Sequence, residues 1–407
     1  MATSQQFDLI FLGGGNFTFQ TINNLLHDGY RGRIAVVERR NSFVKNHRWC
    51  TWWPANAPLP RGTSAQWNAY FFRHQGNWQK RELNNWRYIH IESGQFYKTS
   101  LKDWEKSAQV EILWGESAEG SVHREENLQH VELSNRELIA PRVIDTRYRT
   151  DLTPSEAFSR KTGWWQSFYG QIIPGNHSPI DGGFGLMDFD LPEREGFAFG
   201  YILPLSENQT LFEYTAFHRE AKSLNHMKAQ LATYLGENIS ATSNPAQEEY
   251  GWLPMSSDLS RATDLPGLWQ GGLRSNGARP ATGYAYYRNR QRAQQISQAI
   301  LRDQILPASP RQTSSDWLDP IFLETLVDQP ALTKHSMLTL MKQLQGDEMA
   351  AFLTDQPSPL TLAKVLWTLP KIPFLAGVMS LAARDYSPTT GSRQSVPTRR
   401  KAQPNYS

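Results

Sequence analysis

The first forty residues carry a pattern of apolar and polar positions that predicts a strand, a tight turn, a helix and a second strand. Residues 7–12 form a short apolar run typical of a buried parallel strand, and Gly13, Gly14 and Gly15 follow it directly. Residues 16–27 then place apolar side chains at helical spacing, and residues 33–38 form a second apolar strand that ends in an acid. This order predicts a Rossmann-type dinucleotide-binding unit.

Further along, the chain alternates between strand-like and helix-like patterns. Strands are predicted at 88–91, 110–114, 131–133 and 142–145, a hairpin over 196–217 with its turn near Glu207 and Asn208, helices over 221–235 and 317–383, and a glycine-rich loop opening into a long helix over 268–299. Residues 46–86 are dense in Trp, Asn, Arg and His without a clean period, which predicts loops and irregular strands. Residues 384–407 are rich in Pro, Ser, Thr, Arg and Lys and predict a disordered tail.

Length and composition exclude several classes of protein. The 407 residues predict two to three domains, and a net charge of +3 with interspersed signs argues against nucleic-acid binding. Cys50 is the single cysteine, so no internal disulfide and no cysteine-rich metal site is expected, and we predict no metal. No signal peptide and no apolar run long enough to span a bilayer is evident, which predicts a cytoplasmic protein.

The glycine turn predicts a phosphate-binding site. Gly13 and Gly15 occupy the first two glycine positions of the dinucleotide fingerprint, and the N-terminus of the following helix offers free N–H groups to a pyrophosphate. Thr18 stands at the third glycine position, where it would push helix and strand slightly apart. Glu38, at the end of the second strand, is placed to accept hydrogen bonds from a ribose.

A second glycine-containing loop, at 268–284, favours FAD over a freely exchanging nicotinamide cofactor. We therefore predict an α/β fold with a Rossmann-type FAD-binding domain, a β-rich substrate domain and helical C-terminal elements. The predicted boundaries are 1–160 plus 245–310 for a discontinuous FAD-binding domain, 161–244 for the substrate domain, 311–383 for the helical region and 384–407 for the tail.

Seven short blocks, in one order over residues 7–383, resemble the flavin-dependent lycopene cyclases of bacteria. They are the glycine turn, Asn46-His47-Arg48-Trp49, Val143-Ile144-Asp145-Thr146-Arg147, Phe168-Tyr169-Gly170-Gln171, Leu203-Pro204-Leu205-Ser206 with Leu211-Phe212-Glu213, Glu249-Tyr250-Gly251-Trp252-Leu253-Pro254, and the segment from Gly272 to Tyr284. The resemblance implies the lycopene cyclase or flavoprotein hydroxylase-like fold, and an apolar polyene or isoprenoid as substrate.

The resemblance also implies a mechanism. Tightly bound FAD acts in its reduced form, with NADPH or another reductant as the electron source, in a redox-neutral ring closure that begins with protonation of an alkene. Glu213 matches the essential acid of the family, and burial on an apolar strand would raise its pKa and keep it protonated. Glu249 is a second candidate acid. Trp164, Trp165 and Phe168 are aromatic side chains that could face a cation.

The remaining candidate residues are predicted to bind the cofactor. They are Gly13, Gly15, Asn16, Glu38, Arg39, Asn46, Trp49, Asp145, Arg147, Gly272, Arg279, Pro280, Thr282 and Gly283. The chain departs from the family pattern in two motifs: Tyr214 stands where a second acid usually follows, and Arg279 and Ala281 replace a histidine and a threonine. Both departures are compatible with a substrate other than lycopene.

Two other functions remain open from the sequence. A flavin-dependent monooxygenase or halogenase acting on an apolar or aromatic substrate would use the same fold, although two tryptophans separated by one residue, a halogenase signature, do not occur in this chain. The second alternative is a non-catalytic protein that carries hydrophobic ligands.

Residues 359–381 form the most apolar part of the chain, interrupted by Lys364, Pro370, Lys371 and Pro373. They predict either a C-terminal helix pair packed on the substrate domain or a peripheral contact with a membrane. The oligomeric state cannot be read from the sequence.

Overall fold

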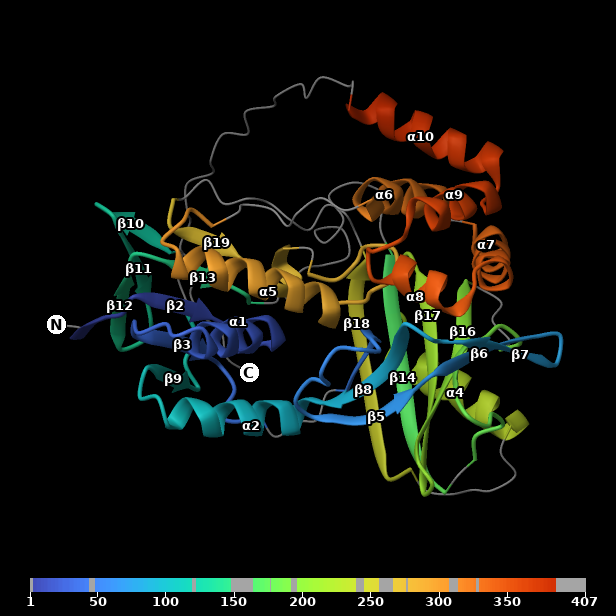
Figure 1. The fold of residues 1–407 in the computed structure, drawn as a ribbon, viewed down its shortest axis with the longest axis horizontal. Coiled ribbons are helices and arrows are strands. Elements are labelled where there is room, and N and C mark those ends of the chain that lie inside the picture. The colour runs from blue at the N-terminus through green and yellow to red at the C-terminus, as the bar shows by residue number, and fades with distance from the viewer. Residues whose placement is uncertain are drawn as a thin grey trace, which may run out of the picture.

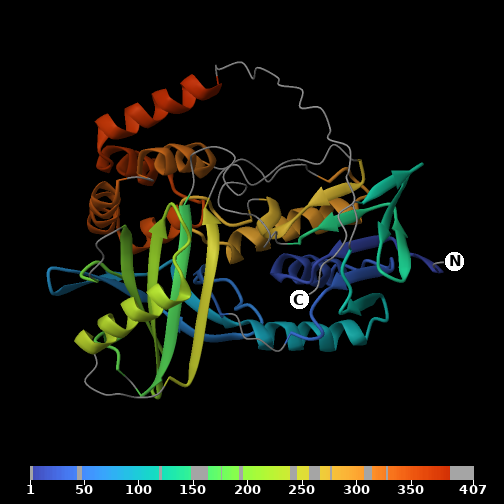
Figure 2. The same ribbon diagram turned by 180° about the vertical axis from the view of Figure 1, so that it is seen from behind.

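The computed structural model describes residues 3–43, 48–118, 122–147, 164–175, 177–191, 196–238, 245–255, 266–275, 277–306, 314–326 and 329–385. A parallel sheet with its helices lies beside a larger sheet, and a layer of helices covers one end of the larger sheet (Figure 1). Seen from behind, helix α4 (Leu224–Asn238) lies across the back of the larger sheet (Figure 2).

The parallel sheet forms the predicted dinucleotide-binding unit. Its five strands, in spatial order, are β19 (Leu268–Gln270), β13 (Val143–Asp145), β2 (Leu9–Leu12), β3 (Ile34–Glu38) and β9 (Val110–Trp114). Helix α1 (Asn16–His27) connects β2 to β3, and α2 (Ser93–Glu105) and α5 (Tyr286–Leu301) complete the helical layer. Four of these strands, β2, β3, β9 and β13, come before β14 in the chain, and β19 comes after β18. The parallel sheet is therefore built from two parts of the chain that are separated by strands of the larger sheet.

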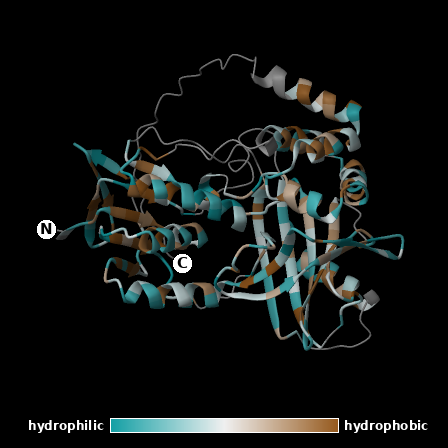
Figure 3. Ribbon diagram, in the orientation of Figure 1, coloured by the Kyte–Doolittle hydropathy of each residue, from teal (hydrophilic) through white to brown (hydrophobic). Residues whose placement is uncertain are grey.

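Both faces of this parallel sheet are buried. Leu9 and Phe11 of β2 pack among the helices, whereas Ile10 and Leu12 pack under a four-stranded sheet. That small sheet consists of β1 (Thr3–Gln6), β12 (Arg136–Ala140), β11 (Leu128–Glu132) and β10 (His123–Glu125). Burial on both faces is why β2 and β3 read as continuous apolar runs, which are coloured brown in Figure 3.

The larger sheet carries the substrate domain and corrects its predicted boundaries. Its seven strands, in order, are β18 (Gln247–Met255), β14 (Trp164–Pro174), β17 (Gln209–His218), β16 (Phe197–Ser206), β15 (Phe184–Asp188), β6 (Ala69–His74) and β7 (Asn77–Glu82). The hairpin of β16 and β17 turns at Glu207 and Asn208 as predicted. However, β6, β7 and β18 come from segments that we assigned to the FAD-binding domain, so the limits 1–160, 161–244 and 245–310 are wrong at these strands.

The segment predicted as loops and irregular strands, 46–86, is instead built mainly of regular strands. Besides β6 and β7 it contains β4 (Arg48–Pro54) and β5 (Thr63–Trp67), which flank β8 (Trp86–Glu92) in a three-stranded antiparallel sheet. Trp52 and Trp53 of β4 point to different faces and are both buried, one in each of the two main cores. Because both faces are covered, the alternation that marks a half-exposed strand is absent from the sequence.

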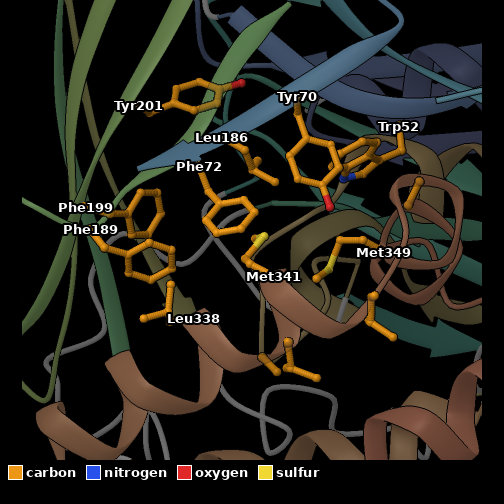
Figure 4. Packing of buried hydrophobic residues seen from close by; sticks show 14 of the residues in the cluster. Trp52, Tyr70, Phe72, Leu186, Phe189, Phe199, Tyr201, Leu338, Met341 and Met349 are labelled. Carbon is orange, nitrogen blue, oxygen red and sulfur yellow. The ribbon is translucent and has the colours of Figure 1, made fainter. Parts of the chain in front are cut away.

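The C-terminal helices form the layer over the end of the larger sheet. They are α6 (Ser314–Leu326), α7 (Pro330–Gln343), α8 (Gly346–Leu353), α9 (Pro359–Thr368) and α10 (Lys371–Asp385). Figure 4 shows Met341 of α7 next to Phe72 of the sheet, Leu338 of α7 below Phe189, and Met349 of α8 below Tyr70. The helices and the sheet therefore share one hydrophobic core.

A buried ion pair joins this helical layer to the loop before α5. The guanidinium of Arg279 is 2% exposed, donates hydrogen bonds to Asp319 at 2.9 and 3.1 Å, and stacks on Phe352. Asp355 lies 3.5 Å away. The charge of Arg279 is therefore paired with protein carboxylates, and Arg279 also lines the cavity described below.

We expect Asp319→Ala to destabilise the protein by about 3 kcal/mol, because it removes the carboxylate that accepts hydrogen bonds from the buried guanidinium of Arg279. The double variant Arg279→Met with Asp319→Leu should recover part of that loss, since it removes both charges of this pair while Arg288 remains 3.8 Å from Asp355. Urea unfolding of the three proteins measures both effects. Equal unfolding midpoints for Asp319→Ala and the unaltered chain would contradict this role for the pair.

Candidate functional site

The turn between β2 and α1 has the geometry of a phosphate-binding loop. Gly13 adopts a φ of +101°, and a Cβ atom there would lie 2.9 Å from Thr146 Oγ1, so the position requires glycine. Thr18, the residue at the third glycine position, is buried and donates a hydrogen bond to the Gly13 carbonyl at 2.7 Å. Thr18 thus ties the helix to the turn, contrary to the expected separation of helix and strand.

The N-terminus of α1 is open. Gly15 is the N-cap, no side chain caps the helix, and no acidic residue lies in the first turn. A Cβ atom on Gly15 would meet no atom within 4 Å, and the side-chain amide nitrogen of Asn16 is buried without a hydrogen-bond partner. Unpaired N–H donors at a positive helix end are suited to a bound anion, so these residues fit the pyrophosphate of FAD.

Glu38 lies beside this turn, at the end of β3, and is held by Arg40. Its Oε2 accepts hydrogen bonds from Gly14 N and Arg40 Nη2, each at 2.8 Å, and its Oε1 accepts from Arg40 N and Nε. Burial alone would raise the pKa of Glu38, but the hydrogen bonds and charge of Arg40 bring it below its usual value. Arg40 lines the cavity described below, whereas the predicted Arg39 is exposed at the strand end.

The carboxyl end of β13 brings other predicted residues next to the glycine turn. Asp145 accepts hydrogen bonds from Arg147 at 2.8 and 3.0 Å and lies 3.3 Å from Arg274, a cation that the sequence reasoning did not select. Gly272, with a φ of +62°, begins the short helix that carries Arg274. Parallel strands end at one edge of the sheet, so β2, β13 and β19 place these residues together.

The other predicted cofactor residues line a cavity next to this edge or lie outside the described residues. Trp49 contacts Phe96, Tyr97 and Tyr286 and lines the cavity. Thr282 and Gly283 line it too, whereas Pro280 is buried in the same loop. Asn46 lies outside the described residues. The sequence reasoning found this loop through its glycines.

The cavity, of about 660 Å³, extends from the cofactor edge across the inner face of the large sheet to the helical layer. Most of its lining is apolar, and it includes Phe168, Phe199 and Phe217 from three strands. Trp164 and Trp165 are buried but do not line it, so only Phe168 of the three predicted aromatic side chains faces the cavity. A site of this size and character suits an apolar small molecule.

Two carboxylates stand side by side on the sheet wall of the cavity. Gly170 of β14 pairs with Glu213 of β17 on one side and with Glu249 of β18 on the other. A Cβ atom on Gly170 would lie 3.4 Å from carbon atoms of both glutamates and 3.0 Å from Leu211. The missing side chain of Gly170 therefore leaves the space in which the two acids approach each other.

The surroundings give the two acids different charges. Burial, and then the charge of Glu249, raise the pKa of Glu213 to about 8, which its hydrogen bond from Thr215 Oγ1 at 2.6 Å only partly offsets. Burial also raises the pKa of Glu249, but Arg48 counteracts this with an ion pair at 3.1 Å. At neutral pH the pair thus holds a proton on Glu213 and a negative charge on Glu249, next to Arg48.

The alternation of side chains along β17 determines where Tyr214 lies, the residue that stands where the family usually has a second acid. Successive side chains of a strand point to opposite faces, so Tyr214 faces away from the cavity, where it is buried against α4 among Met227 and Leu231. An acid at this position would lie on the far side of the sheet from Glu213. The second carboxylate on the cavity face comes from the neighbouring strand, as Glu249.

One group of potential metal ligands lies apart from the cavity, on the small sheet at the other end of the molecule (Figure 1). His123, His130 and Glu137 have ligand atoms within 4.8 Å of one another, and His130 Nδ1 already lies 2.9 Å from a Glu137 oxygen. This group does not bear on the chemistry of the cavity.

The raised pKa of Glu213 makes stability depend on pH in a predictable direction. Between pH 4.5 and about 8 the unfolded chain releases a proton that the folded chain keeps, so the contribution of Glu213 to stability falls as pH rises. We expect Glu213→Gln to gain stability over the unaltered chain by at most about 1.4 kcal/mol per pH unit across this window. Urea unfolding from pH 5 to 8 measures the difference, with Glu248→Gln, which changes an exposed glutamate of β18, as control. A difference that does not vary with pH would contradict the assignment.

Comparison with known proteins identifies the family. The model of the lycopene cyclase protein family matches residues 8–377. The lycopene beta-cyclase of Pseudescherichia vulneris is 32% identical over 165 residues, which cover 38% of this chain and 40% of that protein. The aligned stretch thus spans less than half of that relative.

Solved structures of low sequence identity share the fold. A geranylgeranyl bacteriochlorophyll reductase-like protein of Thermoplasma acidophilum superimposes with a TM-score of 0.58 at 13% identity, over 93% of this chain and 99% of that one. The p-nitrophenol 4-monooxygenase of Pseudomonas putida gives 0.52 at 13% identity, over 89% and 97%. A myxobacterial chondrochloren halogenase gives 0.52 at 12% identity, over 94% and 91%.

These structures confirm the predicted flavoprotein fold, which different chemistries share. Family and fold together support an FAD-dependent enzyme. The predicted resemblance is also confirmed: with a family match over almost its whole length, this chain belongs to the lycopene cyclase family.

Proposed function

We propose that this protein binds FAD and, with the flavin reduced by NADPH or another reductant, closes a ring in an apolar polyene or isoprenoid without net oxidation. The observation that carries the proposal is the pair of carboxylates on the wall of an apolar cavity, of which Glu249 has the cation of Arg48 beside it at 3.1 Å and Glu213 accepts a hydrogen bond from Thr215. A protonated carboxylic acid in a dry site is what protonation of an alkene needs.

The residues around the glycine turn would hold the cofactor. Gly13, Gly15 and Asn16 would bind its pyrophosphate, and the loop that carries Thr282 and Gly283 would contact its ring system. Reduced FAD, when bound, supplies electron density that stabilises positive charge in a reaction that transfers no net electrons. The ion pair of Glu38 and Arg40 stands where a ribose would bind, so one of its hydrogen bonds would be exchanged for a ribose hydroxyl.

Glu213 would begin the reaction by donating its proton to the terminal double bond of the substrate. The new C–H bond leaves a tertiary carbocation, the next double bond attacks this cation to close the ring, and a proton leaves the carbon beside the resulting cation. That proton returns to the carboxylate pair, so substrate and product are isomers and the enzyme is restored. Ionised Glu249 lowers the energy of nearby positive charge, and the faces of Phe168, Phe199 and Phe217 add to this effect.

The mass of the product and the role of Glu213 as proton donor can both be tested. With anaerobically reduced enzyme and an acyclic polyene such as lycopene, we expect a product of unchanged mass, and we expect Glu213→Gln to lower its rate at least about 100-fold, since it cannot supply the proton. Glu248→Gln changes the residue next to Glu249 on β18, which is exposed on the other face of the sheet, and should keep the activity. Mass spectrometry of the products decides: a product that gains oxygen or halogen only in air would replace this proposal with a monooxygenase or halogenase.

The second prediction concerns Arg48, which acts through Glu249 as a positioning residue. In the unaltered enzyme the rate should fall as pH rises through about 8, where Glu213 loses its proton. Arg48→Gln removes the cation that favours ionised Glu249, so the proton moves from Glu213 towards Glu249 and kcat should fall about 10-fold. The last deprotonation of the pair becomes harder, so the alkaline limb of the profile should move to higher pH.

The pH profile of kcat distinguishes this role from a structural one, because a variant that is merely less stable keeps the limb in place. Arg61→Gln, which removes an exposed arginine paired with Asp103, is the matched control. An unshifted limb in Arg48→Gln would show that Arg48 does not set the charge of the pair.

A further inference from the structure

Helices α9 and α10 present a large apolar surface to solvent. Of the twelve large hydrophobic residues that are exposed in the described part of the chain, seven lie on this pair. They are Leu360, Leu366, Trp367, Ile372, Leu375, Val378 and Met379, and Ile372 and Trp367 are 83% and 78% exposed. Apolar side chains gathered in this way on one surface mark a site of interaction.

The two helices are docked on the protein by their other faces. Phe374 of α10 contacts Phe322 of α6, Ser380 donates a hydrogen bond to Glu324 at 2.7 Å, and Val365 of α9 is buried in the core. Ile372, Leu375 and Met379 recur at helical spacing on the outer face of α10, the uppermost helix in Figure 1. This pair therefore has one face for the protein and a second apolar face that none of the described residues buries.

The charges of this surface favour a lipid bilayer as its partner. Residues 359–380 contain no acidic residue, and their two charged residues are Lys364, which forms an ion pair with Glu348 of α8, and Lys371. Lys371 lies over the ring of Trp367, with its Nζ 3.9 Å from the ring centre. Exposed apolar residues accompanied by tryptophan and lysine are the composition of segments that lie at the surface of a membrane.

The geometry fits a segment that lies in one leaflet. Among the described residues no single helix is long and apolar enough to cross a bilayer, and α9 and residues 371–380, which pass that test together, are bent by 101°. Both helices are also attached to the protein along one face. The pair can therefore insert its outer side chains without leaving its place on α6.

The cavity extends to the inner faces of these two helices. Val365 and Leu369, at the C-terminal half of α9, and Phe374 of α10 line it, together with Met337 and Phe322 of the underlying helices. The cavity thus continues from the inner side of the helix pair to Glu213 on the sheet wall. A polyene that entered between the two helices would meet apolar side chains on its way to Glu213.

We propose that the outer faces of α9 and α10 dock on the surface of a lipid bilayer and that the apolar substrate enters the cavity from the bilayer between these two helices. The proposed docking is argued only from the exposed apolar residues of α9 and α10. The identity of the substrate, in contrast, rests on the proposed cyclase function. A second copy of this chain could cover the same surface, and the experiment below separates the two occupants.

The experiment is co-sedimentation of the full chain with vesicles of phosphatidylcholine containing phosphatidylglycerol. We expect the unaltered chain to sediment with the vesicles and the double variant Ile372→Glu with Met379→Glu to bind at least about 10-fold more weakly, because two charges would have to enter the lipid. Ile305→Glu is the matched control, since Ile305 is 91% exposed but lies far from the pair in the chain, at the end of α5. The melting temperature and flavin content of each variant report on its fold.

Three results would overturn docking on a bilayer. One is absence of vesicle binding by the unaltered chain, and another is equal binding by the double variant. The third is that the unaltered chain sediments as a dimer and the double variant as a monomer, which would assign the surface to a second copy of this chain.

Substrate access has its own readout. The double variant should convert a detergent-solubilised polyene at the normal rate and a vesicle-embedded one at least about 10-fold more slowly. Equal rates on both would overturn access from the bilayer. If the unaltered chain binds vesicles but converts neither form of the polyene, the cyclase proposal is overturned and the proposed docking is retained.

Discussion

The chemistry of this protein depends on the close approach of two glutamates across a glycine. Gly170 lies between Glu213 and Glu249 in the middle of three adjacent strands, and its lack of a side chain lets both carboxyl groups share one part of the cavity wall. Neither group is easily ionised in these apolar surroundings, and their mutual repulsion makes double ionisation harder still. One proton is therefore retained at neutral pH.

Arg48 decides where that proton resides. Its ion pair with Glu249 is almost wholly buried, so the cation acts on this carboxyl with little screening by water. Arg48 is the first residue of β4 and belongs to one of the blocks that resemble the cyclase family, and its side chain contacts both Glu249 and Gln247 of β18. The acid, its charged neighbour and the cation thus come from three segments that only the assembled domains bring together.

The departures from the family pattern have separate physical consequences. Tyr214 faces α4, so it alters the packing behind the sheet and leaves the carboxylates of the cavity unchanged. Arg279 introduces a cation into the lining of the cavity, and Asp319 and Asp355 accompany it. A buried arginine is tolerated only with such partners, and the pair also fixes the loop of Thr282 and Gly283 to the helical layer. The cation of this substituted position is thus balanced by carboxylates other than Glu213 and Glu249.

The sequence by itself determined what depends on local pattern. The strand, turn and helix around Gly13, the hairpin that carries Glu213 and the C-terminal helices follow from short-range spacing, and the ordered blocks identified the family. These features need no knowledge of distant neighbours, because periodicity and glycine conformation are properties of a few consecutive residues.

Tertiary structure alone decided which distant segments meet. The order of strands in the large sheet, with β14 between β17 and β18, makes Glu249 the partner of Glu213, and it recruits β6 and β7 from the segment that showed no period. Arg40, Arg48 and Asp319 acquired their roles in the same way. A pattern along the chain states which face a side chain takes but not what lies opposite it, so the charges of this site could be assigned only once the strands and domains had been placed side by side.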